Sequence, residues 1–400
     1  MLFAAFAGCS PKEDSDSADT ADQSGETTDA SSNSGSANKV VKIGVFEPAS
    51  GDNGAGGKQE TLGVQYAHSL APTVEIAGET YDVELVIVDN ESSNDKGPTA
   101  AASLVSQGVS IVLGSYGSGV SIAGSPVFEE AGIPVVGITC TNPAVTEDNT
   151  HYFRICFLDP FQGTVLANFA AENFEAQKAY CLAKLGDDYS VGLCHYFKEA
   201  FEALGGEVQY ETFPDGTSDY ASYVANAKNF GADVFFAPVS TEAAALIIDQ
   251  TAAQGGEFPL LAGDTWDSNV ITEAAKGKTV AVFVTTFYQE GGNPEFDAGI
   301  KEWINADSTR LANNNGNDMI AAVSAMGYDS YFTALEALKL AGSTDPKAVN
   351  EALWATTFSG VSGDIAFDDV NGDAIRDVAY VKEADTEVGE WKFIAVQGIK

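Results

Sequence analysis

Small hydroxyl-bearing side chains gather where one apolar segment of the sequence ends. The apolar run 133–136 is followed directly by the sequence GITCTNP at 137–143, which contains Thr139 and Thr141. Strands buried on both faces are continuous apolar runs, and open α/β sheets bind ligands beyond the carboxyl ends of their strands. If the extended geometry continues, the two threonine side chains share one side of the chain. This position is typical of a ligand-binding site.

A serine occupies a second position of this kind. Ser118 immediately precedes a predicted helix that begins near Val120. The N-terminus of a helix presents unpaired N–H donors and the positive end of a dipole, which suits an anion such as a carboxylate. From these residues alone, however, ordinary helix caps and turn hydroxyls are the favoured explanation.

Other motifs lack a spacing or a residue that their chemistry requires. The glycine-rich segment 51–59 resembles a phosphate-binding loop, but its glycine spacing is wrong and Gln59 stands where a magnesium-ligating Ser or Thr is required. Segment 369–373 resembles a calcium loop without the glutamate at the twelfth position. Cys194-His195 is an isolated pair without zinc spacing, and three scattered histidines give no basis for a Ser-His-Asp arrangement. The sequence therefore predicts no catalysis, cofactor or metal.

Alternating strands and helices must position the hydroxyls. Strand candidates at 40–46, 83–88, 109–114 and 133–139 are separated by helices that begin near Lys58, Pro98 and Val120. This order predicts a parallel sheet with right-handed crossovers. A second series follows, with helices at 162–175, 190–204, 219–230 and 241–254 and strands at 179–185, 208–213, 233–239, 259–262 and 279–286. The predicted fold is therefore α/β, with two Rossmann-like lobes.

After residue 288 the chain carries more elements than a second lobe needs. Helices are predicted at 294–305, 319–340 and 346–355, and strands in hairpins at 363–367 and 374–396. A chain that returns to the first lobe and then to the second crosses the waist three times. We therefore predict lobe 1 at 40–160 plus 288–360 and lobe 2 at 161–287 plus 361–400. Three such crossings form a hinge, and a ligand would lie in the cleft beside it.

Composition agrees with two cores and excludes some partners. With 400 residues, 44% of them hydrophobic, the chain exceeds what a single core usually supports. The balance of 20 basic against 58 acidic residues gives a net charge of −38, which opposes nucleic acid and anionic lipid surfaces.

The N-terminus suggests export. Residues 1–9, MLFAAFAGC, resemble the end of a bacterial lipoprotein signal peptide, in which Cys9 becomes lipid-modified. No positive region precedes the short apolar run, so the true start of the signal is expected upstream of Met1. Residues 10–38 are small and polar and predict a disordered, acidic tether. No later stretch is apolar enough to span a bilayer.

Four further cysteines allow two interpretations. In an exported chain Cys140 could pair with Cys156 and staple the loop between two neighbouring strands. Buried free thiols explain Cys140, Cys156, Cys181 and Cys194 equally well.

The sequence resembles the type I periplasmic binding proteins, in particular the branched-chain amino acid binding proteins of ABC transporters. The likeness covers residues 40–400 and depends on the order and spacing of short motifs. These are Lys42-Ile43-Gly44-Val45, Ser50-Gly51-Asp52, Gly114-Ser115-Tyr116-Gly117-Ser118, Thr141-Asn142-Pro143, Phe153-Arg154, Asp159-Pro160-Phe161-Gln162-Gly163, Gly263-Asp264-Thr265-Trp266-Asp267-Ser268 and Phe367-Asp368 with Asn371-Gly372-Asp373.

The resemblance implies roles for particular residues. Hydroxyls and backbone N–H groups at Ser118, Thr139 and Thr141 would hold the α-carboxylate of an amino acid. Asp264 would pair with its α-ammonium group and Tyr189 would close over it. The side-chain pocket would be lined by Tyr116, Phe161, Trp266 and Tyr328. As alternatives, Asp264 would cap the Trp266 segment and Tyr189 would be a packing residue.

Departures from the family leave the ligand open. Many members have a bulky residue where this chain has Gly54-Ala55-Gly56-Gly57, and a lobe-two aromatic is replaced near Val239 and Ser240. A lobe-one disulfide of some members, at positions matching Ser92 or Ser93 and Gly117, is absent. A small amide or aromatic acid is therefore an alternative ligand.

The function predicted by the resemblance is that of a solute-binding protein of an ABC importer. We expect a lipid-anchored, extracytoplasmic monomer that passes an amino acid to a permease and its ATPase subunits. The alternatives are a ligand sensor that docks to a membrane receptor and, with no motif to support it, an exported α/β enzyme.

Overall fold

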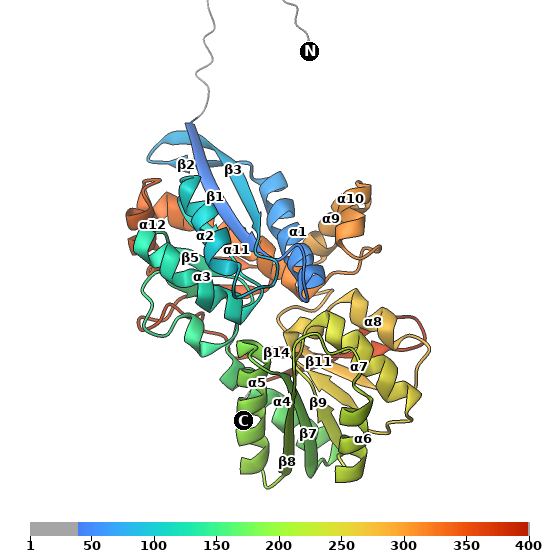
Figure 1. The fold of residues 1–400 in the computed structure, drawn as a ribbon. Helices are drawn as coiled ribbons and strands as arrows, with labels where there is room; N and C mark the ends of the chain where they lie inside the picture. Colours follow the sequence, from blue (N-terminus) through green and yellow to red (C-terminus); the bar gives the residue numbers. More distant parts are fainter. Residues whose placement is uncertain (1–38, 399–400) are drawn as a thin grey trace, which may run out of the picture. The chain divides into compact units, whose positions relative to one another are not determined.

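The computed structural model describes residues 39–398, and one sheet organises the first part of this range (Figure 1). Its strand order is β2-β3-β1-β4-β5-β6, with β2 antiparallel to β3 and the other pairs parallel. The strands are β1 (Lys39–Glu47), β2 (Thr73–Ile76), β3 (Glu79–Asp89), β4 (Ile111–Leu113), β5 (Val135–Gly137) and β6 (Tyr152–Arg154). Because β4 and β5 are wholly buried apolar strands, polar side chains follow them only at their carboxyl ends.

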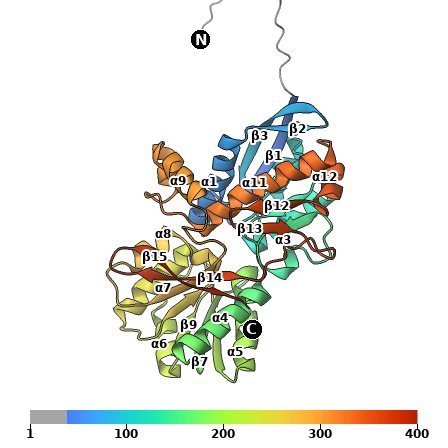
Figure 2. The ribbon, with the colours of Figure 1, turned by 180° about the vertical axis from the view of Figure 1, so that it is seen from behind.

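Helices from two distant parts of the chain pack on this sheet to form lobe 1. They are α1 (Gly54–Leu70), α2 (Gly97–Ser106), α3 (Ser118–Ala131), α9 (Pro294–Asn305), α10 (Ser308–Asn313), α11 (Ala322–Ala341) and α12 (Pro346–Leu353), with a hairpin of β12 (Thr357–Gly360) and β13 (Gly363–Ala366). Figure 2 shows α11 and this hairpin together on one side of the lobe.

Helices α1 and α11 approach closely because each contributes a glycine. A Cβ on Gly63 would lie 1.9 Å from the carbonyl oxygen of Ser324, and one on Gly327 would lie 2.2 Å from that of Glu60. No larger side chain fits at either position without moving backbone. This contact fixes the part of α1 that carries Gln59 and Glu60, both of which are buried.

Lobe 2 is built on a seven-stranded sheet of order β15-β14-β11-β10-β9-β7-β8. The strands are β7 (Lys178–Lys184), β8 (Glu207–Phe213), β9 (Val234–Phe236), β10 (Leu260–Ala262), β11 (Val282–Thr286), β14 (Ala379–Asp385) and β15 (Glu390–Gln397). Its helices are α4 (Asp159–Phe174), α5 (Asp188–Ala203), α6 (Ala221–Phe230), α7 (Thr241–Ala253) and α8 (Asn269–Ala275). Strands β14 and β15 are antiparallel and close one edge, whereas the remaining pairs are parallel.

The chain passes between the two sheets three times. The passages lie between β6 and α4, between β11 and α9, and between β13 and β14. The predicted lobe boundary is residue 360. Ile365 and Phe367 still pack in the core of lobe 1, so the third passage begins beyond that residue.

Several elements escaped prediction because they are short. These are β2, β6, α8, α10 and β12. The predicted lipidation at Cys9 and the tether at 10–38 lie outside the described residues. Cys140, Cys156, Cys181 and Cys194 are buried free thiols, so the Cys140–Cys156 staple is not formed. Within residues 39–398 no helix combines the length and apolar character that a membrane span needs.

Candidate functional site

The loop after β5 carries Thr139 and Thr141 at the carboxyl end of the lobe 1 sheet, and both side chains are buried. Thr139 Oγ1 donates a hydrogen bond to Glu60 Oε1 at 2.9 Å. Thr141 Oγ1 has no hydrogen-bond partner among the described residues. A buried hydroxyl without a partner costs free energy unless a ligand or water satisfies it. Thr141 is therefore placed to donate to a bound group.

Arg154 fixes the shape of this loop. Its guanidinium, wholly buried, donates to the carbonyl oxygens of Cys140 at 3.0 Å and Asn142 at 2.5 Å. It also forms an ion pair with Asp373 at 2.5 Å. Because Asp373 lies in the third passage between the lobes, Arg154 joins the Thr139–Thr141 loop to the hinge.

Ser118 is the first residue of α3 and faces the same loop. The backbone N–H of Asn142 donates to Ser118 Oγ at 3.2 Å, and Ser118 is buried. The helix offers its first N–H groups beside this hydroxyl. Ser118, Thr139 and Thr141 are thus brought together by the structure, on the lobe 1 wall of the cleft between the lobes.

Lobe 2 contributes a carboxyl group and a phenol. Asp264 follows β10 and is 1% exposed. Tyr189, in the first turn of α5, donates its hydroxyl to Asp264 Oδ1 at 3.0 Å. Gly263 has no room for a side chain because a Cβ would lie 2.4 Å from the Tyr189 hydroxyl oxygen. Asp264 makes no side-chain capping bond, so the alternative role as a helix cap has no support.

Tyr116 closes the cleft from the lobe 1 side. Its hydroxyl donates to the carbonyl oxygen of Thr265 in lobe 2 at 3.2 Å. Gly56 leaves room for this ring, since a Cβ there would lie 2.5 Å from it. A cavity of about 50 Å³ remains at the mouth, with Tyr116, Tyr189 and Thr265 in its wall. The phenol therefore occupies the space that a bulkier first loop would fill.

Buried acids that sequence analysis did not assign surround these groups. Glu60 in α1 and Asp159 at the start of α4 are both 0% exposed, and Glu47 at the end of β1 is 2% exposed. Both carboxylate oxygens of Asp159 lack a hydrogen-bond partner among the described residues. Glu60 lies on a helix, where an acid ordinarily indicates a solvent-facing surface, so its burial had no signal in the sequence.

Burial changes the protonation of these acids. It raises the pKa of Asp264 to about 7, and the pKa values of Glu60 and Asp159 to about 8. The negative charge of Asp264 raises the pKa of each of the other two further, which requires the three carboxyl groups to lie near one another. Such groups ionise readily only when a positive charge enters the cleft.

Three predicted pocket residues lie elsewhere or pack differently. The ring of Tyr328 packs against Tyr66, Phe296 and Phe332 in lobe 1. Trp266 is fully buried in the lobe 2 core and donates from Nε1 to the carbonyl oxygen of Val239 at 3.0 Å. Phe161 packs on Phe157. None of these contacts involves Asp264, and a place in the side-chain pocket stays a prediction for the three residues.

An amide cluster joins the lobes beside the cleft. Asn269 of lobe 2 donates to the carbonyl oxygen of Asn314 and to Asn317 Oδ1, each at 2.7 Å. Its Oδ1 accepts from Gln59 Nε2 at 3.2 Å and from Asn315 Nδ2 at 3.0 Å. All four partners belong to lobe 1, so these bonds require the lobes to be close.

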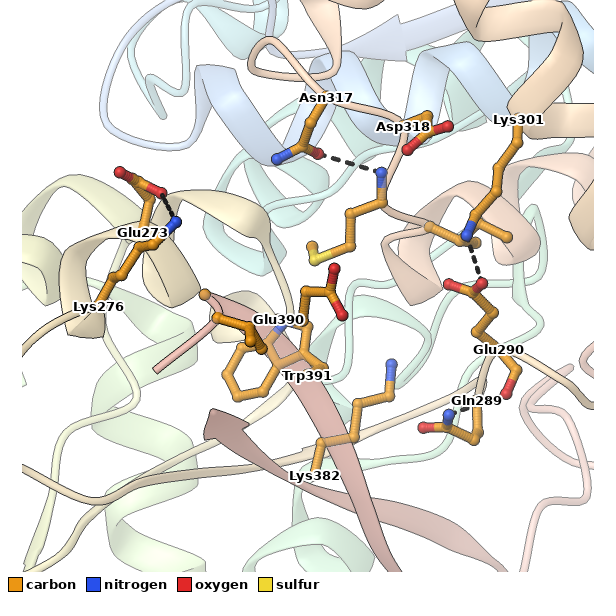
Figure 3. Close-up of a pocket in the computed structure, with 14 residues that line it drawn as sticks. Glu273, Lys276, Gln289, Glu290, Lys301, Asn317, Asp318, Lys382, Glu390 and Trp391 are labelled. Atoms are coloured by element: carbon orange, nitrogen blue, oxygen red, sulfur yellow. Dashed lines mark hydrogen bonds and ion pairs between the residues drawn. The ribbon is translucent and has the colours of Figure 1, made fainter. Parts of the chain in front are cut away.

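A separate hollow of about 270 Å³ has Asn317 of this cluster in its lining (Figure 3). Lys276, Lys301 and Lys382 extend toward it. Each lysine is already paired, with Glu273, Glu290 and Asp267 respectively. The three lysines that extend toward the hollow are therefore already paired, although Gln289 Oε1 and Trp391 Nε1 in its lining lack a hydrogen-bond partner among the described residues.

Comparison with known proteins agrees with the fold. The family model described as periplasmic binding protein matches residues 40–387. The chain belongs to this family, which consists of solute-binding proteins and implies a location outside the cytoplasm. Its fold is the type I periplasmic binding protein fold, with two lobes and mostly parallel sheets.

Amino acid binding appears in the names of several similar proteins. The Leu/Ile/Val-binding protein homolog 1 of Brucella abortus is 30% identical over 341 residues, 84% of this chain and 88% of the relative. A leucine-binding protein, LivK, of Thermotoga maritima is 34% identical with a TM-score of 0.79 over 90% of this chain and 99% of that one. The branched-chain amino acid protein LivJ of Streptococcus pneumoniae, solved with isoleucine, is 25% identical with a TM-score of 0.76, over 90% and 100%.

Proposed function

We propose that this protein captures an α-amino acid in the cleft between its lobes and delivers it to an ABC permease. The observation that supports this proposal is the opposite polarity of the two walls. Lobe 1 presents the hydroxyls of Ser118 and Thr141 with helix N–H groups, which suit a carboxylate. Lobe 2 presents the buried carboxyl of Asp264, which suits an ammonium group.

Binding and closure are coupled in this mechanism. The carboxylate of the ligand binds the lobe 1 wall and its ammonium group binds Asp264, with the Tyr189 hydroxyl orienting the carboxylate of Asp264. Only a ligand that contacts both walls stabilises the closed arrangement. The permease then receives the closed, loaded form. Attachment through a lipid at Cys9, a monomeric state and cooperation with ATPase subunits are parts of the same proposal.

A ligand screen tests the proposed function. We expect at least one of the twenty standard amino acids to stabilise the full chain, by about 2.7 kcal/mol at a hundredfold excess over Kd. Thermal unfolding monitored by fluorescence measures the effect. The best ligand is then compared with analogues that lack its amino or its carboxyl group, and both should lose the effect. Stabilisation by an analogue without an amino group would contradict the role of Asp264.

Amino acid affinity will fall as the pH is lowered from about 7.5 to about 5.5. Burial and the charge of Asp267 raise the pKa of Asp264 to about 7, against the hydrogen bonds from Gln162 and Tyr189. Below that pH the free site is protonated, and binding an ammonium group must release the proton. Affinity then falls by up to about tenfold per pH unit below this pKa and levels off about one pH unit above it.

Calorimetry in buffers of different ionisation enthalpy measures this release directly. The residual binding of an Asp264→Asn variant serves as the control, because its pH dependence should be smaller. An affinity that is constant across this range would contradict the assignment of Asp264 as the ammonium partner.

A further inference from the structure

The cleft contains more buried carboxyl groups than are needed to bind the single ammonium group of an aliphatic amino acid. Four buried carboxyl groups lie near one another behind its walls, those of Glu47, Glu60, Asp159 and Asp264. Within residues 39–398 none of the four forms an ion pair. The nearest buried cations are already committed, since Arg154 pairs with Asp373 and Lys382 with Asp267.

Two of these acids face each other on lobe 1. Glu60 accepts from Thr139 Oγ1 through Oε1, and Glu47 accepts from the backbone N–H of Tyr116 through Oε2 at 2.7 Å. The other oxygens, Glu60 Oε2 and Glu47 Oε1, have no hydrogen-bond donor among the described residues. Burial raises the pKa of Glu60 to about 8 and holds the pKa of Glu47 well above its usual range, so the facing groups are largely protonated in the empty cleft. A positive charge that enters the cleft would convert one of them to a carboxylate on the wall opposite Asp264.

The charge balance decides between ligand classes. A zwitterion with an aliphatic side chain brings one positive charge, which Asp264 pairs, and one negative charge, so the Glu60–Glu47 pair and Asp159 stay protonated and buried without a cationic partner. An amino acid with a basic side chain brings a further positive charge. This further charge lets one of the buried acids ionise and form a buried ion pair, whereas an aliphatic side chain offers these acids no partner, and the cleft therefore favours the second class.

The polar groups that line the cleft also favour an amino acid with a basic side chain. The phenol of Tyr116 occupies the room left by Gly56, and the hydroxyls of Thr139 and Thr141 and the amide of Gln162 border the acids. Gln162 Oε1 also lacks a donor among the described residues. A second group that donates hydrogen bonds would satisfy such oxygens, whereas an aliphatic side chain would bury them unpaired.

We propose that the ligand is an α-amino acid with a basic side chain, whose cationic end is bound by Glu60 with Glu47 behind it. This inference rests on the proposed function and makes the ligand net positive. Asp264 retains the α-ammonium group, and Glu60 determines the specificity for the side chain.

Isosteric ligand pairs test the inference on the unaltered full chain. L-lysine is compared with L-norleucine, and L-arginine with L-citrulline, by calorimetry. In at least one pair the charged member should bind about 30-fold more tightly or better, since a buried charge pair supplies such a difference. If norleucine or leucine binds as tightly as any charged amino acid, the inference is overturned and the proposed function stands. If no amino acid binds, the proposed function fails and the inference with it.

A Glu60→Gln variant locates the effect. The ratio between the charged and neutral ligand should shrink to within about threefold, because the amide keeps the shape of the side chain and removes its charge. Glu130→Gln on the exposed face of α3 is the matched control and should leave the ratio unchanged. If Glu60→Gln does not fold, Glu47→Gln replaces it with the same expected direction. An unchanged ratio in a folded variant would overturn the role of Glu60.

Discussion

Asp264→Asn will weaken amino acid binding by about 2–4 kcal/mol, or roughly 30-fold to 1000-fold in Kd. The asparagine keeps the size of the side chain and can still accept the Tyr189 hydrogen bond. It lacks the charge, so the ammonium group of the ligand would be buried without a negative partner in contact. Leaving one member of a buried charge pair alone accounts for most of the expected loss.

Calorimetry with the best ligand of the screen measures this loss. Asp95→Asn, at an exposed position, is the matched control and should leave Kd within about twofold, since surface changes of this kind have small effects. The unliganded Asp264→Asn variant should unfold at the same temperature as the parent or higher, because it no longer buries an ionisable group. A Kd within threefold of the parent would remove Asp264 from the site.

Asn269→Ala will weaken ligand binding, although Asn269 is expected to act through bonds between the lobes and not through contact with the ligand. Asn269 makes four hydrogen bonds to lobe 1, and these bonds exist only when the lobes are close. In an open form water would satisfy the same groups, so the substitution costs free energy mainly in the closed form. Leaving several buried partners unsatisfied should weaken binding by about 2–3 kcal/mol.

Stopped-flow kinetics separates this effect from a change in ligand contacts. We expect the dissociation rate to rise by about 30-fold or more while the association rate changes little, since interface substitutions act mostly on dissociation. Asn173→Ala, on the exposed face of α4, is the matched control. An unchanged dissociation rate would mean that the amide cluster does not stabilise the closed form.

The fold could be predicted from sequence because its signals are periodic and repeated. Buried parallel strands such as β4 and β5 are purely apolar, and the helices between them have regular polar faces. β6 has only three residues and forms because it can pair beside β5, which no local pattern indicates. The strands predicted at 109–114, 133–139 and 233–239 are longer than β4, β5 and β9, since apolar residues continue into the loops. In contrast, β1 and β3 extend beyond the predicted 40–46 and 83–88.

Site residues could be predicted from the sequence where they directly follow a strand. They could not be predicted where their placement depends on how helices pack. Thr139, Thr141 and Asp264 follow strands and therefore meet at the carboxyl ends of the sheets. Tyr328 was placed in the pocket from family resemblance, but its helix turns that ring into the lobe 1 aromatic cluster. Glu60, in contrast, was not predicted as a site residue. The close approach of α1 to α11 buries this acid, which the sequence places on an ordinary helix.

The guanidinium of Arg154 has a practical consequence for making the protein. It holds the loop of Thr139 and Thr141 through carbonyl oxygens on both sides of Thr141, in the place where a bond between Cys140 and Cys156 is one of the two interpretations that the sequence allows. Hydrogen bonds to an arginine do not depend on an oxidising compartment. The folded residues therefore need no oxidative step, and the reducing cytoplasm of an expression host is suitable for producing material with the cleft intact.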